Sequence, residues 1–255
     1  MAEESAAWQV PSADLTLPED EIHIWRAFLD QAPFSIERLK SLLADDERQR
    51  AASFHFVRDR NRFIVARGLL RTILGLYLRS EPRGLRFLYS ARGKPSLAPA
   101  GKGSKGSAGE VRFNLAHSHE VALFAFSSAC EPGIDVEFVR PLADARQIAE
   151  RFFSVRENGV LRELDPVEMH RRFFLYWTRK EAYLKALGEG LAGLAGDIRQ
   201  IDTAAPPGQP LIVPPSQDNG QRSWLVHDIE PAPGYVAALA FPQQDMQIVY
   251  YQLAF

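Results

Sequence analysis

The sequence predicts an α+β protein with two similar lobes in a pseudo-two-fold arrangement, each lobe a small antiparallel sheet packed against a long helix. Two observations predict this fold class. Long helical stretches occupy residues 58–78 and 170–187, one in each half of the chain. Strand-like segments follow both, and residues 121–126 (VALFAF) resemble residues 236–241 (VAALAF). A unit that occurs twice in one chain indicates an internal repeat.

The spacing within each half supports the same interpretation. Arg67 in the first long helix precedes Val121 by 54 residues, and Glu181 in the second precedes Val236 by 55. We therefore expect the two lobes to be related by duplication, with a cleft between them.

The length of the chain fits this division. With 255 residues it is long for one compact domain and short for three. We expect residues 1–131 to form an N-terminal lobe and residues 132–255 a C-terminal lobe, with the active site in the cleft between them.

The first half alternates short strands with helices. Through the longest helix, apolar residues recur at helical spacing with arginines on the opposite side. A turn is predicted at 92–95, and residues 98–109, rich in Gly, Ser and Lys, are predicted to form a loop. The other predicted elements are strands at 21–29, 85–89, 111–115 and 121–126 and helices at 36–43, 45–56 and 58–78.

The second half repeats the plan. A strand is predicted at 133–138, and further strands follow the last helix to the end of the chain. Residues 203–222 contain five prolines and are predicted to form a connecting loop. The helices of this half are predicted at 146–153, 156–164 and 170–187.

Composition restricts the class of protein. The hydrophobic fraction of 46% and the charged fraction of 24% are typical of a globular protein, and no apolar run approaches the roughly 20 residues that span a bilayer. The acidic start lacks the features of a secretory signal. Cys130 is the single cysteine, which excludes an internal disulfide and predicts a small buried apolar residue. We expect a cytoplasmic protein without membrane contact.

The charge distribution indicates a local anion site. A net charge of −2 gives no general attraction to nucleic acid, so no nucleic-acid partner is expected. Arginines nevertheless crowd residues 48–71. Several of them are expected only to solvate the outer side of a helix.

The predicted strand at 133–138 carries two acidic residues on one face. Apolar residues alternate with Asp135 and Glu137, and a strand places alternate side chains on the same side. Two neighbouring carboxylates repel each other unless a cation lies between them. The pattern therefore indicates a cation site.

The predicted helix at 170–187 offers a matching stripe. Trp177, Glu181 and Lys185 recur at steps of four, which aligns an aromatic ring, a carboxylate and an ammonium group. Oxygen ligands without a cysteine or histidine cluster suit Mg²⁺, which is usually shared between carboxylates and substrate phosphates. Together the two segments predict a magnesium site beside a phosphate.

Simpler interpretations exist for each segment taken alone. An Asp-x-Glu pair can form the solvated face of an edge strand. Glu181 and Lys185 are also spaced for an ordinary helix ion pair, worth about 0.2–0.5 kcal/mol. The combination of the two segments favours the metal and phosphate site.

The ordered motifs resemble a known family. They are Gly93-Lys94-Pro95, Phe113-Asn114-Leu115-Ala116-His117-Ser118, Gly133-Ile134-Asp135-Val136-Glu137, Arg151-Phe152-Phe153-Ser154 with Glu157, and Trp177 with Lys180-Glu181 and Lys185. In these motifs, over nearly its whole length, the chain is similar to the larger, monomeric, pseudo-dimeric phosphopantetheinyl transferases, the type that activates surfactin synthetase.

The resemblance implies an activity and a metal. It implies transfer of the 4′-phosphopantetheine arm of coenzyme A to a serine of an acyl or peptidyl carrier protein. Mg²⁺ would be held by Asp135, Glu137 and Glu181. Lys185 would hold the charge that develops on the leaving diphosphate, and Glu157 corresponds to a family carboxylate that could act as the base.

The resemblance also implies a coenzyme A site. Arg50 would meet the ribose 3′-phosphate, His117 the pyrophosphate, and Lys94 another part of the coenzyme. The full set of coenzyme-binding residues implied in this way is Arg50, Arg92, Lys94, Asn114, His117 and Lys185. Two positions depart from the family pattern. Ala116 stands where a serine is common, and Glu47 where some members carry a second lysine.

Other interpretations remain beside the transferase. Trp177 is expected to be a core or cleft-wall aromatic rather than a substrate contact. A magnesium-dependent phosphohydrolase or nuclease would use similar carboxylates, and a non-catalytic module that binds coenzyme A or a carrier protein would keep the fold. Carrier docking is expected near the Glu157 helix, with Arg151, Arg156 and Arg162 as candidates, and the protein is expected to be a monomer.

Overall fold

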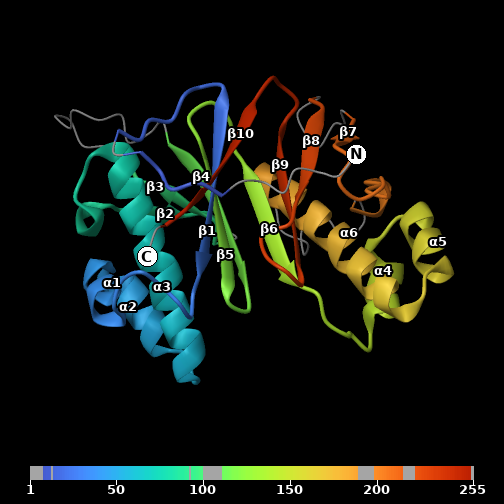
Figure 1. Ribbon diagram of the computed structural model, residues 1–255, viewed down its shortest axis with the longest axis horizontal. Coiled ribbons are helices and arrows are strands. Elements are labelled where there is room, and N and C mark those ends of the chain that lie inside the picture. The colour runs from blue at the N-terminus through green and yellow to red at the C-terminus, as the bar shows by residue number, and fades with distance from the viewer. Residues whose placement is uncertain are drawn as a thin grey trace.

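The computed structural model describes residues 8–12, 14–91, 93–99, 111–188, 198–214 and 222–253. Two helix-covered lobes lie side by side, with their strands in the middle of the molecule and the long helices α3 and α6 on either side (Figure 1). The predicted α+β fold class is confirmed. Among the described residues, no helix combines the length and apolar composition needed to cross a bilayer.

The first lobe is built on a four-stranded sheet in the order β10-β1-β5-β4. β1 pairs with β5 antiparallel, and β5 with β4 antiparallel, whereas β10 joins β1 in parallel. The last strand of the chain therefore completes the first sheet. The strands are β1 (Glu21–Phe28), β4 (Arg112–Ser118), β5 (Val121–Ser127) and β10 (Gln247–Gln252), with a separate hairpin of β2 (Phe87–Tyr89) and β3 (Pro95–Leu97).

The second lobe holds a four-stranded antiparallel sheet in the order β6-β9-β8-β7. β6 is an edge strand, and β4 is an edge strand of the first sheet. The two edges lie against each other without sharing a backbone ladder. The strands are β6 (Gly133–Phe138), β7 (Leu211–Val213), β8 (Trp224–Ile229) and β9 (Tyr235–Pro242).

Each lobe carries one long helix of 22 residues, α3 or α6. α6 begins where Asp165 accepts hydrogen bonds from two amides of the first turn and Pro166 occupies the first helical position. It ends at Gly188, whose φ of 76° suits glycine. The α-helices are α1 (Ile36–Leu42), α2 (Asp45–Ala52), α3 (Val57–Leu78), α4 (Ala145–Phe152), α5 (Val155–Glu163) and α6 (Pro166–Leu187).

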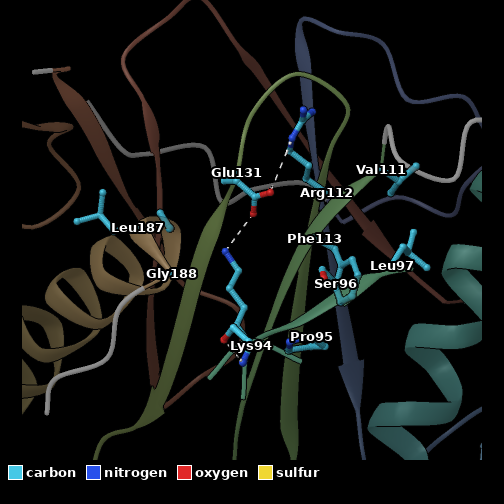
Figure 2. Close-up of a pocket in the computed structure, with 12 residues that line it drawn as sticks. Lys94, Pro95, Ser96, Leu97, Val111, Arg112, Phe113, Glu131, Leu187 and Gly188 are labelled. Carbon is cyan, nitrogen blue, oxygen red and sulfur yellow. Dashed lines mark hydrogen bonds and ion pairs between the residues drawn. The ribbon is translucent and has the colours of Figure 1, made fainter. Parts of the chain in front are cut away.

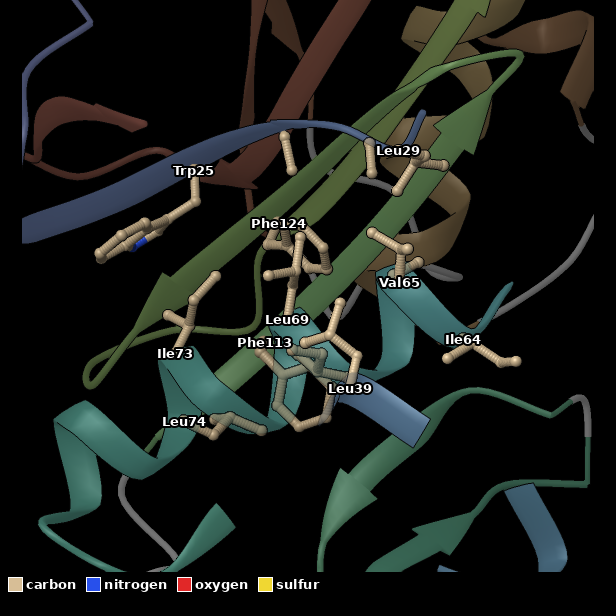
Figure 3. Close-up of a cluster of buried hydrophobic side chains, with 14 of the residues drawn as sticks. Trp25, Leu29, Leu39, Ile64, Val65, Leu69, Ile73, Leu74, Phe113 and Phe124 are labelled. Carbon is tan, nitrogen blue, oxygen red and sulfur yellow. The ribbon is translucent and has the colours of Figure 1, made fainter. Parts of the chain in front are cut away.

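Alternation along the strands separates the core into layers. In β5, Phe124 and Phe126 pack with α3, whereas Leu123 and Ala125 pack against the second sheet. The α3 side of this core gathers side chains from α1, α3, β1, β4 and β5 (Figure 3). A middle layer joins the two sheets, and α6 packs on the outer side of the second sheet. Burying each large apolar side chain contributes about 1.5–3 kcal/mol.

Most predicted elements are confirmed, with differences at their ends. α6 begins four residues before the predicted 170, because the Asp165–Pro166 start signal lies there. The helix predicted at 45–56 ends at Ala52, and β3 follows the predicted turn as an additional strand. The proline-rich loop at 203–222 contains β7, and the loop predicted at 98–109 lies largely outside the described residues.

Gly133 allows β6 and α6 to approach each other closely. A Cβ atom at this position would lie 2.0 Å from the Ala182 carbonyl oxygen and 2.4 Å from the Ala186 amide nitrogen. Both are backbone atoms, so the clash could be relieved only by moving the strand or the helix. The acidic face of β6 therefore reaches α6 because residue 133 has no side chain.

We predict that Gly133→Ala lowers the free energy of unfolding by about 3 kcal/mol or more, since overpacking against backbone has no cheap relaxation. Urea denaturation measures the change. Gly159→Ala in α5 is the matched control, because a Cβ atom there meets nothing within 4 Å and should leave stability equal or slightly higher. Equal stability of Gly133→Ala and the natural protein would contradict the packing.

Candidate active site

The centre of the site is a buried ion pair between β6 and α6. Lys185 Nζ donates to Asp135 Oδ1 at 2.7 Å and to the Ile134 carbonyl oxygen at 3.3 Å. Asp135 is only 6% exposed, whereas Lys185 is partly exposed. Asp135 faces α6 because Ile134 and Val136 take the opposite face of the strand into the core between the sheets. The structure therefore brings together the two motifs that the sequence singled out.

Two carboxyl groups of the site, Asp135 and Glu181, have raised pKa values. Burial raises the pKa of Asp135 to about 6, although Lys185 opposes the shift. Burial and the charge of Asp135 raise the pKa of Glu181 to about 7. Glu137 adds to both shifts, so the three acidic side chains are close enough to repel one another.

Glu137 is held by residues of both lobes. It accepts a hydrogen bond from Ser118 Oγ at 2.7 Å and lies 3.6 Å from an Arg140 nitrogen. In the described part of the chain, no three His, Cys, Asp or Glu side chains converge as a metal site. Asp135 and Glu137 instead contact cations and hydrogen-bond donors of the protein.

One feature of Asp135 fits a cation. Its Oδ2 atom is buried and has no hydrogen-bond partner, while Oδ1 is taken by Lys185. A buried anionic oxygen without a partner is costly, and a cation is the group that would satisfy it. With Glu181 one turn before Lys185 on the same helix, these oxygens suit a hard divalent ion such as Mg²⁺.

The first lobe contributes His117 at the end of β4. The imidazole has an exposed face, and burial of the remainder lowers its pKa, as do the positive charges of Lys185 and Arg62. His117 therefore lies near Lys185 across the boundary between the lobes. Arg62, on α3, binds Asp30 through two hydrogen bonds, and its charge reaches the same place. Its proximity to His117 was not foreseen.

Lys94 bridges the lobes at the other end of this boundary. Its ammonium group donates to the Lys185 carbonyl oxygen at 2.9 Å and to Glu131 at 3.0 Å. Beside it lies a pocket of about 340 Å³ between β3, β4 and the end of α6, with the Glu131 side chain between Lys94 and Arg112 (Figure 2). Pro95, Leu97 and Phe113 are among its apolar lining residues.

The predicted site residue Asn114 and the departing position Glu47 both serve the packing of the protein. Asn114 is 4% exposed, and its side-chain oxygen accepts the Ile134 amide at 2.9 Å, so it faces the second lobe. Glu47, at the position noted for its departure from the family, is buried and ion-paired with Arg71 at 2.7 Å.

Glu157 is also fully buried. Ser154 N and Thr203 N donate to it at 2.6 and 2.8 Å, the Thr203 hydroxyl donates as well, and Lys180 lies 3.0 Å away. Burial lowers the pKa of Lys180, whereas Glu157 raises it. Both oxygens of Glu157 are engaged in joining α5, α6 and the segment after residue 198. This placement does not support the predicted role as a base.

The structure places the other predicted residues that it describes on α2, α4, α5 and α6. Trp177 stacks on Phe173 with ring centroids 6.1 Å apart and is half-buried, consistent with the wall interpretation. Arg50 is exposed on α2, with its guanidinium 5.8 Å from the Phe54 ring. Arg92 lies outside the described residues. The docking candidates Arg151, Arg156 and Arg162 are exposed on α4 and α5.

The fold and the site together define a class of protein: a two-lobed α+β enzyme whose acidic and basic groups meet between the lobes. The sequence profile of the 4′-phosphopantetheinyl transferase superfamily matches residues 131–240. A second profile, described as 4′-phosphopantetheinyl transferase, N-terminal, matches residues 25–129.

Individual relatives agree with the profiles. The 4′-phosphopantetheinyl transferase HetI of Nostoc sp. is 40% identical over 233 residues, which cover 91% of this chain and 92% of HetI. The putative 4′-phosphopantetheinyl transferase slr0495 of Synechocystis sp. is 33% identical over 154 residues, 60% of each chain. Sfp of Bacillus subtilis is 29% identical over 157 residues, 61% of this chain and 65% of Sfp. The chain belongs to the 4′-phosphopantetheinyl transferase superfamily.

Glu181→Gln should stabilise the metal-free protein at pH 8. A carboxyl group whose folded pKa is raised to about 7 costs folding energy as pH rises from about 4.5 to 7, because the folded state must then carry the charge. Removing this carboxyl group should raise the free energy of unfolding by on the order of 1–2 kcal/mol at pH 8 after solvent screening, and by less at pH 5.

Thermal unfolding in EDTA at both pH values measures the Glu181 effect. Glu163→Gln, on the exposed end of α5, is the control and should show no such difference. A Glu181→Gln protein that is less stable than the natural protein at pH 8 would show that the carboxylate is favourably paired.

Glu157→Gln should reduce stability far more than turnover. The change leaves the Lys180 ammonium in the interior without its counter-charge, and breaking a buried ion pair typically costs about 3–5 kcal/mol. Urea denaturation measures this loss, and activity is measured at a temperature where the variant is folded. We expect a turnover number within about tenfold of the natural protein, whereas a lost base would lower it about 10²–10⁴-fold.

Proposed function

We propose that this enzyme transfers 4′-phosphopantetheine from coenzyme A to a serine of an acyl or peptidyl carrier protein, with Mg²⁺ as cofactor. In this reaction the serine oxygen forms a bond to phosphorus, the pyrophosphate bond breaks, and adenosine 3′,5′-bisphosphate leaves. The observation that carries the proposal is the meeting of Asp135, Glu181 and Lys185 at the lobe boundary, with Asp135 Oδ2 buried and without a partner.

Asp135, Glu137 and Glu181 are the residues we propose as magnesium ligands. When bound there, the ion would neutralise the diphosphate and polarise the phosphorus under attack. The raised pKa values of Asp135 and Glu181 support this assignment, since a cation relieves the repulsion that causes part of each shift.

Lys185 is proposed to stabilise the leaving diphosphate. The Lys185 side chain is partly exposed beside Asp135, so its ammonium group can reach an anion at the lobe boundary while α6 holds its stem. Donors that are fixed before the reaction stabilise developing negative charge without reorganisation. His117, whose charge-neutral form is favoured by its lowered pKa, would donate a hydrogen bond to the same diphosphate from the first lobe.

Coenzyme A is proposed to lie along the boundary between the lobes. The pocket beside Lys94 has apolar walls and basic groups, which suit an adenosine or pantetheine segment. Arg50 would meet the 3′-phosphate, and Arg92 is proposed as a further coenzyme-binding residue. Asn114 would act on the coenzyme only through the strand it positions, because its carboxamide oxygen is bound to Ile134.

The proposed division into lobes 1–131 and 132–255 fits the β4–β6 boundary, with β10 returning to the first sheet. We propose that the enzyme acts as a cytoplasmic monomer on carrier domains that carry an acidic helix beside their serine. Arg151, Arg156 and Arg162 offer exposed positive charge for such a helix on α4 and α5.

Incubation with coenzyme A, MgCl₂ and an apo carrier protein tests the function by intact-protein mass spectrometry. We expect the carrier to gain the mass of one phosphopantetheine unit, and EDTA to abolish the gain. Asp135→Asn should lower kcat/KM at least about 100-fold, the effect of losing a group that stabilises transition-state charge. Asp245→Asn, in the exposed β9–β10 turn, is the matched control.

Two other outcomes would contradict the proposal. Hydrolysis of coenzyme A without modification of the carrier would indicate a phosphohydrolase. Tight binding of coenzyme A or carrier without either reaction would indicate a non-catalytic binding module.

A further inference from the structure

The boundary between the lobes is formed by two strand edges that do not pair as strands. β4 ends the first sheet and β6 ends the second, and the two lie in contact. An edge strand presents backbone N–H groups that need acceptors when they are buried. On β6, the amides of Ile134 and Phe138 point toward β4 and find side-chain acceptors there.

Two side chains of β4 supply these acceptors. Asn114 Oδ1 accepts from Ile134 N at 2.9 Å, and Ser118 Oγ accepts from Phe138 N at 3.1 Å. The acceptors are four residues apart on β4, and the donors are four residues apart on β6. The two strands therefore run in register. Hydrogen bonds between side chains of β4 and backbone amides of β6 join them in place of a backbone ladder.

Ser118 makes a second bond that reaches the acidic pair. Its hydroxyl donates to Glu137 Oε2 at 2.7 Å while the same oxygen accepts the Phe138 amide. A hydroxyl group can do both at once, whereas an alanine can do neither. Asp135 and Glu137 both lie between the two points of attachment, so the bonds fix the segment that carries them.

The residue between Asn114 and Ser118 on this face of β4, Ala116, is small. Ala116 lies on the same face of β4 as Asn114 and Ser118 and is buried in the layer between the sheets. A longer side chain there would have to fit into this buried layer. The departure from serine noted in the sequence is thus compatible with close packing at this point.

We propose that Asn114 and Ser118 form an interlobe clasp, in which both are positioning residues and Ser118 orients Glu137 for a divalent cation. The clasp sets the acidic pair of β6 relative to His117 of β4. Its cation-binding part rests on the proposed function, since Glu137 is one of the proposed magnesium ligands. Groups that orient metal ligands typically change metal affinity about 10–100-fold when they are removed.

Binding of Mn²⁺, followed by electron paramagnetic resonance without coenzyme A or carrier, tests the role of Ser118. Ser118→Ala should raise the Mn²⁺ dissociation constant about tenfold or more. Ser118→Thr, which keeps the hydroxyl, should restore most of the affinity. Ser127→Ala is the matched control, because Ser127 is a buried serine that accepts backbone amides within the first lobe and should leave affinity unchanged.

A measurement on the natural protein covers the case in which Ser118→Ala does not fold. Amide exchange resolved by nuclear magnetic resonance should show the Ile134 and Phe138 amides exchanging at least about 100-fold more slowly than in an unstructured chain. Fast exchange of both amides would overturn the clasp. Unchanged Mn²⁺ affinity in a folded Ser118→Ala protein, or no Mn²⁺ binding by the natural protein, would overturn the role of Ser118.

These results are separable from the proposed function. Neither measurement uses coenzyme A or a carrier protein. Failure of the natural protein to modify carriers, with Mn²⁺ affinity still lost in Ser118→Ala, would overturn the transferase proposal and leave the clasp standing.

Discussion

A carboxylate that is buried between two lobes needs positive charge beside it, and the arrangement of the site follows from this requirement at Asp135. The strand that carries Asp135 can reach α6 only because Gly133 lets two backbones meet without an intervening Cβ atom. That approach brings Lys185 within 2.7 Å of the carboxylate. The ion pair uses one oxygen of Asp135 and leaves the other buried without a partner. Packing, electrostatics and the proposed cation site therefore have one common origin.

Much of the fold could be predicted because its signals are local. The helical spacing of apolar residues in α3 and the alternation of apolar and acidic residues in β6 are each contained in one continuous segment. Both elements therefore lie where the sequence indicated. The parallel pairing of β10 with β1 has no local signal, since it depends on a contact between segments more than two hundred residues apart. The early start of α6 did have a local signal in the sequence. Asp165-Pro166 is a helix-start pattern, but the periodicity of the apolar residues alone does not reveal it.

The candidate site likewise contains residues that local patterns identify and one residue that they do not. Asp135, Glu181 and Lys185 could be found because strand spacing puts the acids of β6 on one face and helix spacing aligns Glu181 with Lys185. The combination of the two segments then favoured a common site. Glu157 shows that one motif can carry two interpretations: Ser154 and Glu157 form a capping box at the start of α5, a pattern that also predicts a structural carboxylate. The function of Asn114 could not be predicted, because its partner is the backbone of a strand in another sheet.

The charges of the site explain how Lys185 could serve both Asp135 and a proposed diphosphate. Lys185 contacts Asp135, and its charge opposes the upward pKa shifts that burial and the neighbouring carboxylates cause in Asp135 and Glu181. The lysine ammonium donates to Asp135 and to the Ile134 carbonyl, and it carries a further N–H beyond these two. Under the proposed function, a diphosphate alone would meet acidic repulsion, whereas a diphosphate that arrives with a divalent cation would bring positive charge to the unpartnered Asp135 oxygen and negative charge to Lys185. The proposed site would then be complementary to the charge of the pair more than to either partner by itself.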